Sequence, residues 1–219
     1  MNKTAIIVGS TGVTGSILLK KLCEDSRYSC IKTFSRSPNS LKNPKIQPFI
    51  VDLFDPDSFS KDFSGDELYC CIGTTKAKTP NEDQYYKVDF GIPVALAKLC
   101  KQKNINTYVV VSALGADAKS SIFYNRTKGK MEEAVLSEEI LHTFILQPSL
   151  IVSKRKESRW GETFFIYLMK FINPVLMGKF KKYRSVPASY IADAMIYLSN
   201  EGYHKNKIPS DEIQKLAKF

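Results

Sequence analysis

Histidine is scarce in this chain, and cysteine occurs without a pattern. The only two histidines, His142 and His204, are far apart among the 219 residues, and neither has a second ligand at the spacing of a zinc site. The five cysteines contain no C-x-x-C pair, and two of them are adjacent in an apolar run. An odd number without a framework indicates reduced thiols in an intracellular protein. We therefore expect no metal site and no disulfide scaffold.

Long apolar runs are also missing. The longest, residues 164–177, is too short to span a bilayer and is interrupted by Lys170, Asn173 and Pro174. The opening stretch MNKTAIIVGSTG enters an apolar strand almost at once, which leaves no room for a signal or transit peptide. These features predict a cytoplasmic protein that is not secreted.

Acidic residues are outnumbered by basic ones, 22 to 32, which gives a net charge of +10. Such an excess favours anionic partners: nucleotides, nucleic acid or an acidic membrane face. The positive residues are scattered and no nucleic-acid-binding module is present, so we expect no specific nucleic-acid partner. The basic stretches that flank residues 164–177 leave three interpretations open. They are a solvated rim around a core helix or substrate lid, an interfacial helix on an anionic membrane, and a self-association surface such as a homodimer contact.

Apolar runs of strand length alternate with helix-like segments as far as Pro148. The expected strands are 4–9, 30–35, 46–51, 67–73, 107–113 and 142–148, and the expected helices are 13–22, 88–102, 126–139, 187–200 and 209–219. This alternation predicts a Rossmann-like α/β fold with a doubly wound parallel sheet. We expect a single domain, 1–219. It comprises a cofactor-binding core, 1–148, and a small helical substrate-binding segment, 149–219, over the C-terminal edge of the sheet. Ser210 is expected to cap the last helix.

Three glycines, Gly9, Gly12 and Gly15, stand between the first expected strand and the first expected helix. Glycine lets the backbone turn sharply and approach a pyrophosphate, and the helix start offers free N–H groups and a positive dipole end. The loop is therefore predicted to bind a dinucleotide. Its expected cofactor contacts are Gly9, Ser10, Thr11, Gly12, Val13, Thr14 and Gly15, with hydroxyl donors at Ser10, Thr11 and Thr14.

The region about 20 residues beyond the glycines distinguishes the two nicotinamide cofactors. An NAD site carries an acidic residue there for the ribose hydroxyls, but this chain has Ser35 and Arg36. A guanidinium forks onto phosphate oxygens, so Arg36 suits the 2′-phosphate of NADP. NADP(H) is therefore predicted over NAD(H).

Tyr124 and Lys128 are four residues apart where a predicted helix follows the fifth strand. That spacing puts both side chains on one helix face. A nearby ammonium lowers a phenol pKa from about 10, which would let the tyrosine exchange a proton with a carbonyl oxygen near neutral pH. Ser112 ends the fifth strand, and its hydroxyl is a candidate donor to the developing alkoxide. Ser120 and Ser121 compete for that role.

Several stretches together resemble one known family. The G-x-x-G-x-x-G loop and Y-x-x-x-K are similar to motifs of the short-chain dehydrogenase/reductase family. The segments CCIGTTKAK at 70–78, VVVSALGAD at 109–117 and SSIFYNRTKGKMEE at 120–133 resemble its atypical branch, typified by the Tat-interactive oxidoreductase. That branch includes fungal relatives at the mitochondrial surface, so the resemblance adds peripheral association there as an alternative location.

The resemblance implies a role for each matching residue. Tyr124 is the expected catalytic acid/base, Lys128 the expected ligand of the nicotinamide ribose, and Ser112 the group that polarises the carbonyl. Further expected cofactor contacts are Asp52 and Leu53 near the adenine, Ile72 and Gly73 after the fourth strand, and Pro148 and Ser149 near the nicotinamide. Extended members usually carry asparagine where this chain has Asp89, and no catalytic role is assigned to Asp89.

Two functions of different classes follow. The first is an NADPH-dependent oxidoreductase that transfers hydride to a small carbonyl substrate through the Ser112–Tyr124–Lys128 set. The alternative is a regulatory protein that senses NADPH with little turnover. Tyr124→Phe distinguishes them.

Overall fold

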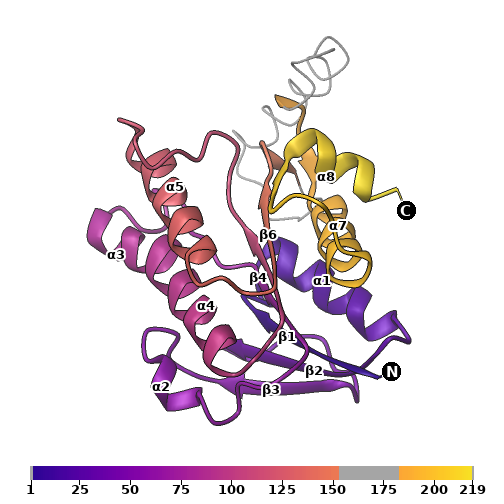
Figure 1. Ribbon diagram of the computed structural model, residues 1–219. Coiled ribbons are helices and arrows are strands. Elements are labelled where there is room, and N and C mark those ends of the chain that lie inside the picture. Colours follow the sequence, from indigo (N-terminus) through magenta and orange to yellow (C-terminus); the bar gives the residue numbers. More distant parts are fainter. Residues whose placement is uncertain (1, 153–182, 219) are drawn as a thin grey trace.

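A computed structural model gives the arrangement of residues 2–152 and 183–218 (Figure 1). Seven parallel strands form one sheet in the order β3-β2-β1-β4-β5-β6-β9. The strands are β1 (Lys3–Val8), β2 (Tyr28–Ser35), β3 (Ile46–Ile50), β4 (Glu67–Cys70), β5 (Thr107–Val111), β6 (His142–Gln147) and β9 (Lys207–Pro209). The strand order reverses between β1 and β4, and in such sheets the crevice at that point binds ligands. The predicted fold is confirmed.

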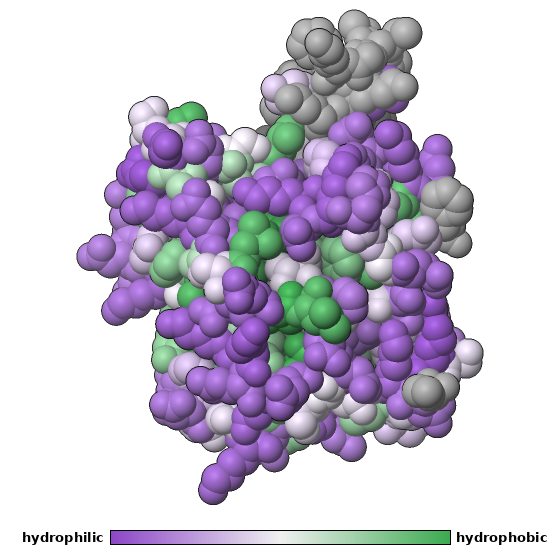
Figure 2. All heavy atoms as spheres, in the orientation of Figure 1, coloured by the Kyte–Doolittle hydropathy of each residue, from purple (hydrophilic) through white to green (hydrophobic). Residues whose placement is uncertain are grey.

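Helices cover both faces of the sheet. They are α1 (Val13–Glu24), α2 (Pro56–Phe59), α3 (Glu82–Tyr86), α4 (Ile92–Gln102), α5 (Phe123–Leu136), α7 (Ala188–Glu201) and α8 (Ser210–Leu216), with a π-helical segment η1 (Lys87–Gly91) between α3 and α4. Figure 1 shows α1, α7 and α8 on one side of the sheet and α3, α4 and α5 on the other. In the same orientation, Figure 2 shows a mostly hydrophilic described surface with apolar side chains gathered near its centre.

The alternation of side chains along β1 explains the two cores. Ala5 and Ile7 point into the cluster under α1 and α7, whereas Ile6 and Val8 point into the cluster under α4 and α5. Successive residues of a strand face opposite sides of a sheet, so a run that is apolar throughout fits a strand covered on both faces. Such a sheet leaves its carboxyl edge free to carry polar and ligand-binding loops.

The C-terminal part of the chain departs from expectation. Its described residues do not lie over the sheet edge alone: α7 packs against α1, and β9 extends the sheet beside β6. A second pair, β7 (Ile151–Val152) with β8 (Val186–Pro187), joins the two parts of this segment. The strand β9 was not predicted because three residues that include a proline carry no recognisable period.

Helix boundaries also shift. The helix α5 begins at Phe123, three residues before the predicted Arg126, and so includes Tyr124. The last helix has Pro209 rather than Ser210 at its N-cap, and the Ser210 hydroxyl instead donates to Ser149 Oγ at 3.1 Å. Residues 164–177, with their three open interpretations, lie outside the described residues. In the part of the chain that is described, no helix is long and apolar enough to cross a membrane.

Candidate functional site

The glycine loop after β1 leaves no room for a side chain at Gly9 or Gly15. Gly9 has φ +89°, and a Cβ there would lie 2.8 Å from the backbone C and O of Cys71. A Cβ on Gly15 would lie 2.1 Å from the carbonyl oxygen of Gly9. The N–H of Gly12 donates to that same oxygen at 3.1 Å. The first turn of α1 therefore sits directly on the end of β1, which is the close approach that a pyrophosphate loop requires.

The start of α1 has no side-chain cap from its N-cap residue, which is Gly12. The first N–H groups of a helix lack partners within the helix, and together with the helix dipole they attract phosphate. The loop thus fits a dinucleotide both in its tight backbone and in its donors.

Two hydroxyl-bearing side chains of the loop, Ser10 and Thr14, are buried. The Ser10 hydroxyl donates to Asn39 Oδ1 at 2.7 Å, and Asn39 Nδ2 in turn donates to Thr33 Oγ1 at 2.7 Å. Ser10 therefore ties the loop to β2 and is not a free donor in this state. Asn39 was missed because it lies in an irregular segment, where no period marks its side chain.

The residues expected near the adenine gather at the ends of β2 and β3. The carbonyl of Ser35 accepts from Val51 N at 3.0 Å, which brings Ser35 close to Asp52. Arg36 and Asp52 are exposed, and the Asp52 carboxylate accepts from Phe54 N at 2.9 Å. Leu53 is buried in the core under α4 and α5, so its side chain packs inside. Arg36 is free to reach a ligand at this edge.

The other expected cofactor contacts follow β4 and β6. Ile72 is half-buried and Gly73 is exposed. Pro148 is buried, and its carbonyl accepts from Leu114 N at 2.8 Å. The Ser149 hydroxyl donates to the carbonyl of Arg184, which links β6 to the segment before β8. All four therefore lie on loops at the carboxyl edge of the sheet.

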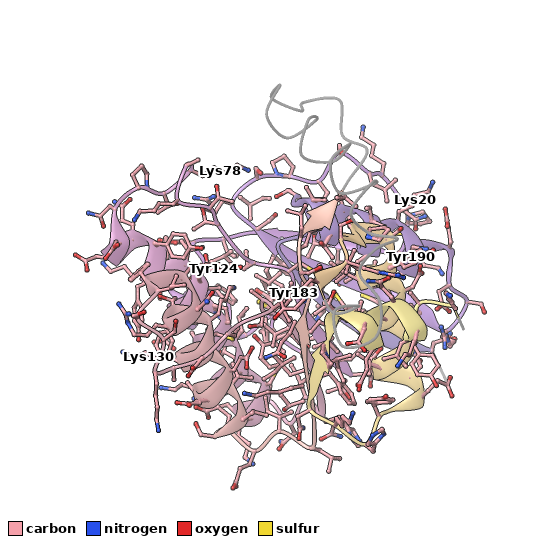
Figure 3. All side chains as sticks on the ribbon, turned by 90° about the horizontal axis from the view of Figure 1, so that it is seen from above. Lys20, Lys78, Tyr124, Lys130, Tyr183 and Tyr190 are labelled. Carbon is pink, nitrogen blue, oxygen red and sulfur yellow. The ribbon has the colours of Figure 1, made fainter. Side chains whose placement is uncertain are left out.

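Tyr124 and Lys128 lie one turn apart on α5, as predicted, but their environments differ. The Tyr124 side chain is 40% exposed, whereas Lys128 is buried and its Nζ lies 2.7 Å from Asp89 Oδ1. Figure 3 shows Tyr124 on the side of α5 nearest the loop of Lys78, whereas Lys130 of the same helix points away from the molecule. Lys128 thus forms an ion pair with Asp89, a residue to which the sequence analysis assigned no catalytic role.

The expected lowering of the Tyr124 pKa is wrong. Partial burial of the phenol is the largest influence and raises its pKa. The Lys128 ammonium lowers the pKa, but the Asp89 carboxylate opposes it, and the net shift is upward. At neutral pH the Tyr124 side chain is therefore a protonated phenol, suited to donate a proton rather than to accept one.

Ser112 lies at the end of β5, yet its hydroxyl is turned toward the core. It donates to Glu132 Oε1 at 2.6 Å. Glu132 is fully buried and also accepts from Gln147 Nε2 at 2.9 Å and pairs with Lys207 Nζ at 2.9 Å. No hydrogen bond joins Ser112 to Tyr124 among the described residues. To polarise a carbonyl, Ser112 would have to exchange Glu132 for the substrate.

A pocket of about 380 Å³ adjoins Tyr124. Its walls come from the loop after β4, from α3 and from the start of α5. The lining residues are Thr74, Thr75, Lys76, Thr79, Pro80, Glu82, Tyr85, Ile122, Phe123 and Tyr124. Tyr85 packs edge-on against both Phe123 and Tyr124, with ring centroids 5.7 and 6.4 Å apart. The exposed part of the Tyr124 phenol thus faces a small cavity with aromatic and aliphatic walls, a setting typical of small-molecule sites.

Comparison with known proteins agrees with this geometry. A family model described as NAD(P)H-binding matches residues 9–161. The chain is 33% identical over 159 residues to the protein FMP52, mitochondrial, of Debaryomyces hansenii, covering 71% of this chain and 70% of that protein. It is 28% identical over 223 residues to the FMP52 protein of Eremothecium gossypii, covering 98% of this chain and 97% of the relative.

Solved structures share the fold. The UDP-glucose 4-epimerase of Thermotoga maritima, solved with UDP-glucose, superposes with a TM-score of 0.70 at 13% identity, covering 98% of this chain and 81% of that one. The Bordetella bronchiseptica enzyme WbmG, solved with NAD, gives a TM-score of 0.62 at 12% identity, covering 78% and 61%.

The names of the relatives contradict one expectation from the sequence. The prediction of a cytoplasmic location is wrong, because these similar proteins are named as mitochondrial. A short N-terminus before an apolar strand does not exclude a mitochondrial protein. The fold and the glycine loop, by contrast, agree with the family match. The chain belongs to the NAD(P)H-binding family, is related to the FMP52 proteins and has a Rossmann fold, which agrees with its resemblance to the atypical short-chain dehydrogenases/reductases.

Proposed function

We propose that this protein is an NADPH-dependent oxidoreductase that reduces a small, largely apolar carbonyl compound. The observation that carries the proposal is the position of Tyr124, whose partly exposed phenol lines the apolar pocket beside the buried Lys128. NADPH, when bound, supplies the hydride. The contribution of this chain is to orient the carbonyl, to exclude water through the aromatic walls and to donate the phenol proton to the carbonyl oxygen.

The walls of the pocket support the substrate class. Pro80, Tyr85, Ile122 and Phe123 supply apolar surface, and the hydroxyls of Thr74 and Thr79 hydrogen-bond to each other at 2.8 Å. A polar sugar would leave many of its own hydroxyls without partners against such walls, which is costly. An aromatic or aliphatic aldehyde or ketone is the better fit.

A direct assay tests the proposal. Purified protein with NADPH should consume the cofactor faster with substituted benzaldehydes and medium-chain aldehydes than with UDP-glucose, whose epimerase shares the fold. Loss of NADPH absorbance and chromatographic detection of the alcohol measure the reaction. If none of the carbonyl probes leads to consumption of NADPH, even when the protein is saturated with NADPH, the proposed reductase activity is contradicted.

Two observations favour a second candidate, a protein that responds to bound NADPH with little turnover. The Ser112 hydroxyl is held by Glu132, and the Lys128 charge is opposed by Asp89. Both features weaken the acid/base set that the resemblance implies. A protein of this second kind would bind NADPH tightly but form no alcohol in the assay above. Its affinity for a partner would differ between the cofactor-bound and the cofactor-free states. The partners suggested by the sequence, an anionic membrane surface or a second copy of the chain, remain proposals.

Cofactor choice rests on Arg36, which is exposed at the end of β2. Arg36→Ala should weaken NADPH binding by about tenfold or more, since a charge-assisted hydrogen bond to the 2′-phosphate is worth about 1.5–3 kcal/mol. NADH binding should change little, because NADH has no 2′-phosphate. Calorimetry with both cofactors measures the effect, and Lys42→Ala, which removes another exposed positive charge, is the control. Equal losses for NADPH and NADH would contradict NADP specificity.

For the location, we propose a mitochondrial protein, because the relatives are named so. Fractionation of cells that express the full chain tests this, and recovery in the cytosolic fraction alone would contradict it.

A further inference from the structure

A buried ion pair links the helix of Tyr124 to its neighbour. Lys128 Nζ on α5 lies 2.7 Å from Asp89 Oδ1 on η1, and the two side chains are 4% and 1% exposed. Removing two charges from water costs several kcal/mol for each ion, so a buried pair is weak evidence for stability. Because this pair lies one helical turn from Tyr124, the candidate proton donor, we ask what it does in the Tyr124 site.

The second oxygen of the same carboxylate holds the pocket. Asp89 Oδ2 accepts from the backbone N–H of Thr74 at 2.8 Å. Thr74 in turn hydrogen-bonds through its hydroxyl to Thr79 at 2.8 Å, and its carbonyl accepts from the Tyr85 hydroxyl at 3.2 Å. One carboxylate therefore fixes both Lys128 and the loop that lines the pocket.

The local helix geometry explains how Asp89 reaches both partners. Residues 82–102 run through α3, η1 and α4, and the middle of this run is π-helical. Pro93 has no N–H to donate to the carbonyl of Asp89 four residues earlier, and its ring would crowd that carbonyl in a regular α-helix. A wider turn relieves the crowding, and such turns occur often at functional sites.

We propose that Asp89 is a positioning residue of this site: one carboxylate oxygen holds Lys128 beside Tyr124, the other holds the pocket loop at Thr74, and the negative charge offsets that of Lys128. The proposal deepens the proposed reductase and rests on it only for the use of the phenol as a proton donor. An ammonium has three donors, so Lys128 keeps two for hydroxyl groups of a ligand.

The groups around Asp89 determine whether its carboxylate raises or lowers the pKa of Tyr124. The charged and titratable groups around it come from three elements: Lys128 and Tyr124 on α5, Tyr85 on α3 and Cys70 on β4. The carboxylate raises the pKa of Tyr124, Tyr85 and Cys70, whereas Lys128 lowers that of Tyr124 and Cys70. Without the carboxylate, Lys128 acts on the Tyr124 phenol unopposed and favours the phenolate.

The experiment is a titration of Tyr124 in Asp89→Asn. The ultraviolet absorbance of tyrosinate is read directly after a pH jump. Subtracting the titration of the same protein with Tyr124→Phe added, in the wild-type and in each variant background, isolates this phenol. Asp89→Asn should move the Tyr124 midpoint to lower pH, because a neutral amide replaces the charge. Asp83→Asn, which removes an exposed carboxylate from α3, is the control and should leave the midpoint unchanged.

Each outcome decides between positioning and packing. A merely structural Asp89 would lower the melting temperature of Asp89→Asn and leave the Tyr124 midpoint in place, which overturns the proposal. If Asp89→Asn does not fold, both charges are removed in Asp89→Asn/Lys128→Met, which leaves no unpaired buried charge, and this variant is compared with Lys128→Met alone. The double variant should have the lower Tyr124 midpoint, and equal midpoints overturn the proposal. The titration needs no turnover, so a failure of the reductase appears in the activity assay alone.

Discussion

Tyr124→Phe is expected to lower kcat for carbonyl reduction by about 10²–10⁴-fold and to leave NADPH affinity within about twofold of wild type. The substitution removes one oxygen and keeps the ring, so the edge-on contact with Tyr85 at 6.4 Å is retained. No hydrogen bond to the Tyr124 hydroxyl is present among the residues that the structure describes, so no buried donor or acceptor loses a partner. We therefore expect little change in stability and a loss confined to proton transfer.

The measurement is the steady-state consumption of NADPH with an aldehyde that the wild-type protein reduces, together with calorimetric binding of NADPH. Tyr86→Phe is the matched control, because it removes a phenol from α3 whose ring stacks on Phe90 with centroids 4.5 Å apart. That control should keep full activity. If Tyr124→Phe reduces the aldehyde at the wild-type rate, another group supplies the proton and the assignment of Tyr124 fails. If both proteins bind NADPH and neither turns over any carbonyl, the cofactor-responsive protein is the better account.

The sheet could be predicted from the sequence because its signal is local. The β1 run is apolar at every position from Ala5 to Val8, and such runs form strands that are covered on both faces. The glycine loop was recognisable for the same reason: strand, three glycines and helix follow one another within a few residues. The pair Tyr124 and Lys128 followed from helical spacing alone.

The environments of these side chains depend on long-range contacts and could not be predicted. Asp89 is 39 residues before Lys128 in the sequence, so no periodic pattern marks their pairing. The expected lowering of the Tyr124 pKa considered the neighbour on its own helix and omitted the carboxylate from the next one, together with burial of the ring. Ser112 shows the same limit, since the buried partner that holds its hydroxyl, Glu132, lies on a different element. Sequence spacing gives the elements of a site, whereas the protonation and orientation of its groups follow from packing.

Gly15→Ala is expected to abolish measurable binding of both NADPH and NADH, with a loss of at least about 100-fold, and to destabilise the fold by about 1–3 kcal/mol or more. The added Cβ would lie 2.1 Å from the carbonyl oxygen of Gly9 and 2.8 Å from its carbonyl carbon. Both neighbours are backbone atoms, so no side chain can move aside. Either α1 shifts away from β1 or the loop opens, and each change removes the N–H groups of the helix start from the place where a pyrophosphate would bind.

Calorimetry with each cofactor and thermal unfolding followed by circular dichroism measure the two effects. Gly91→Ala is the matched control: its backbone is helical, with φ −59° and ψ −53°, and a Cβ there meets no atom within 4 Å. That substitution should keep cofactor binding and leave stability unchanged or raise it by about 0.5–1 kcal/mol. If Gly15→Ala does not fold, Gly12→Ala replaces it, because its Cβ would lie 3.3 Å from the Gly9 oxygen and demands a smaller shift. A folded loop variant that binds NADPH with wild-type affinity would show that the cofactor is held elsewhere, since a phosphate cradle made of backbone cannot lose its shape and keep its ligand.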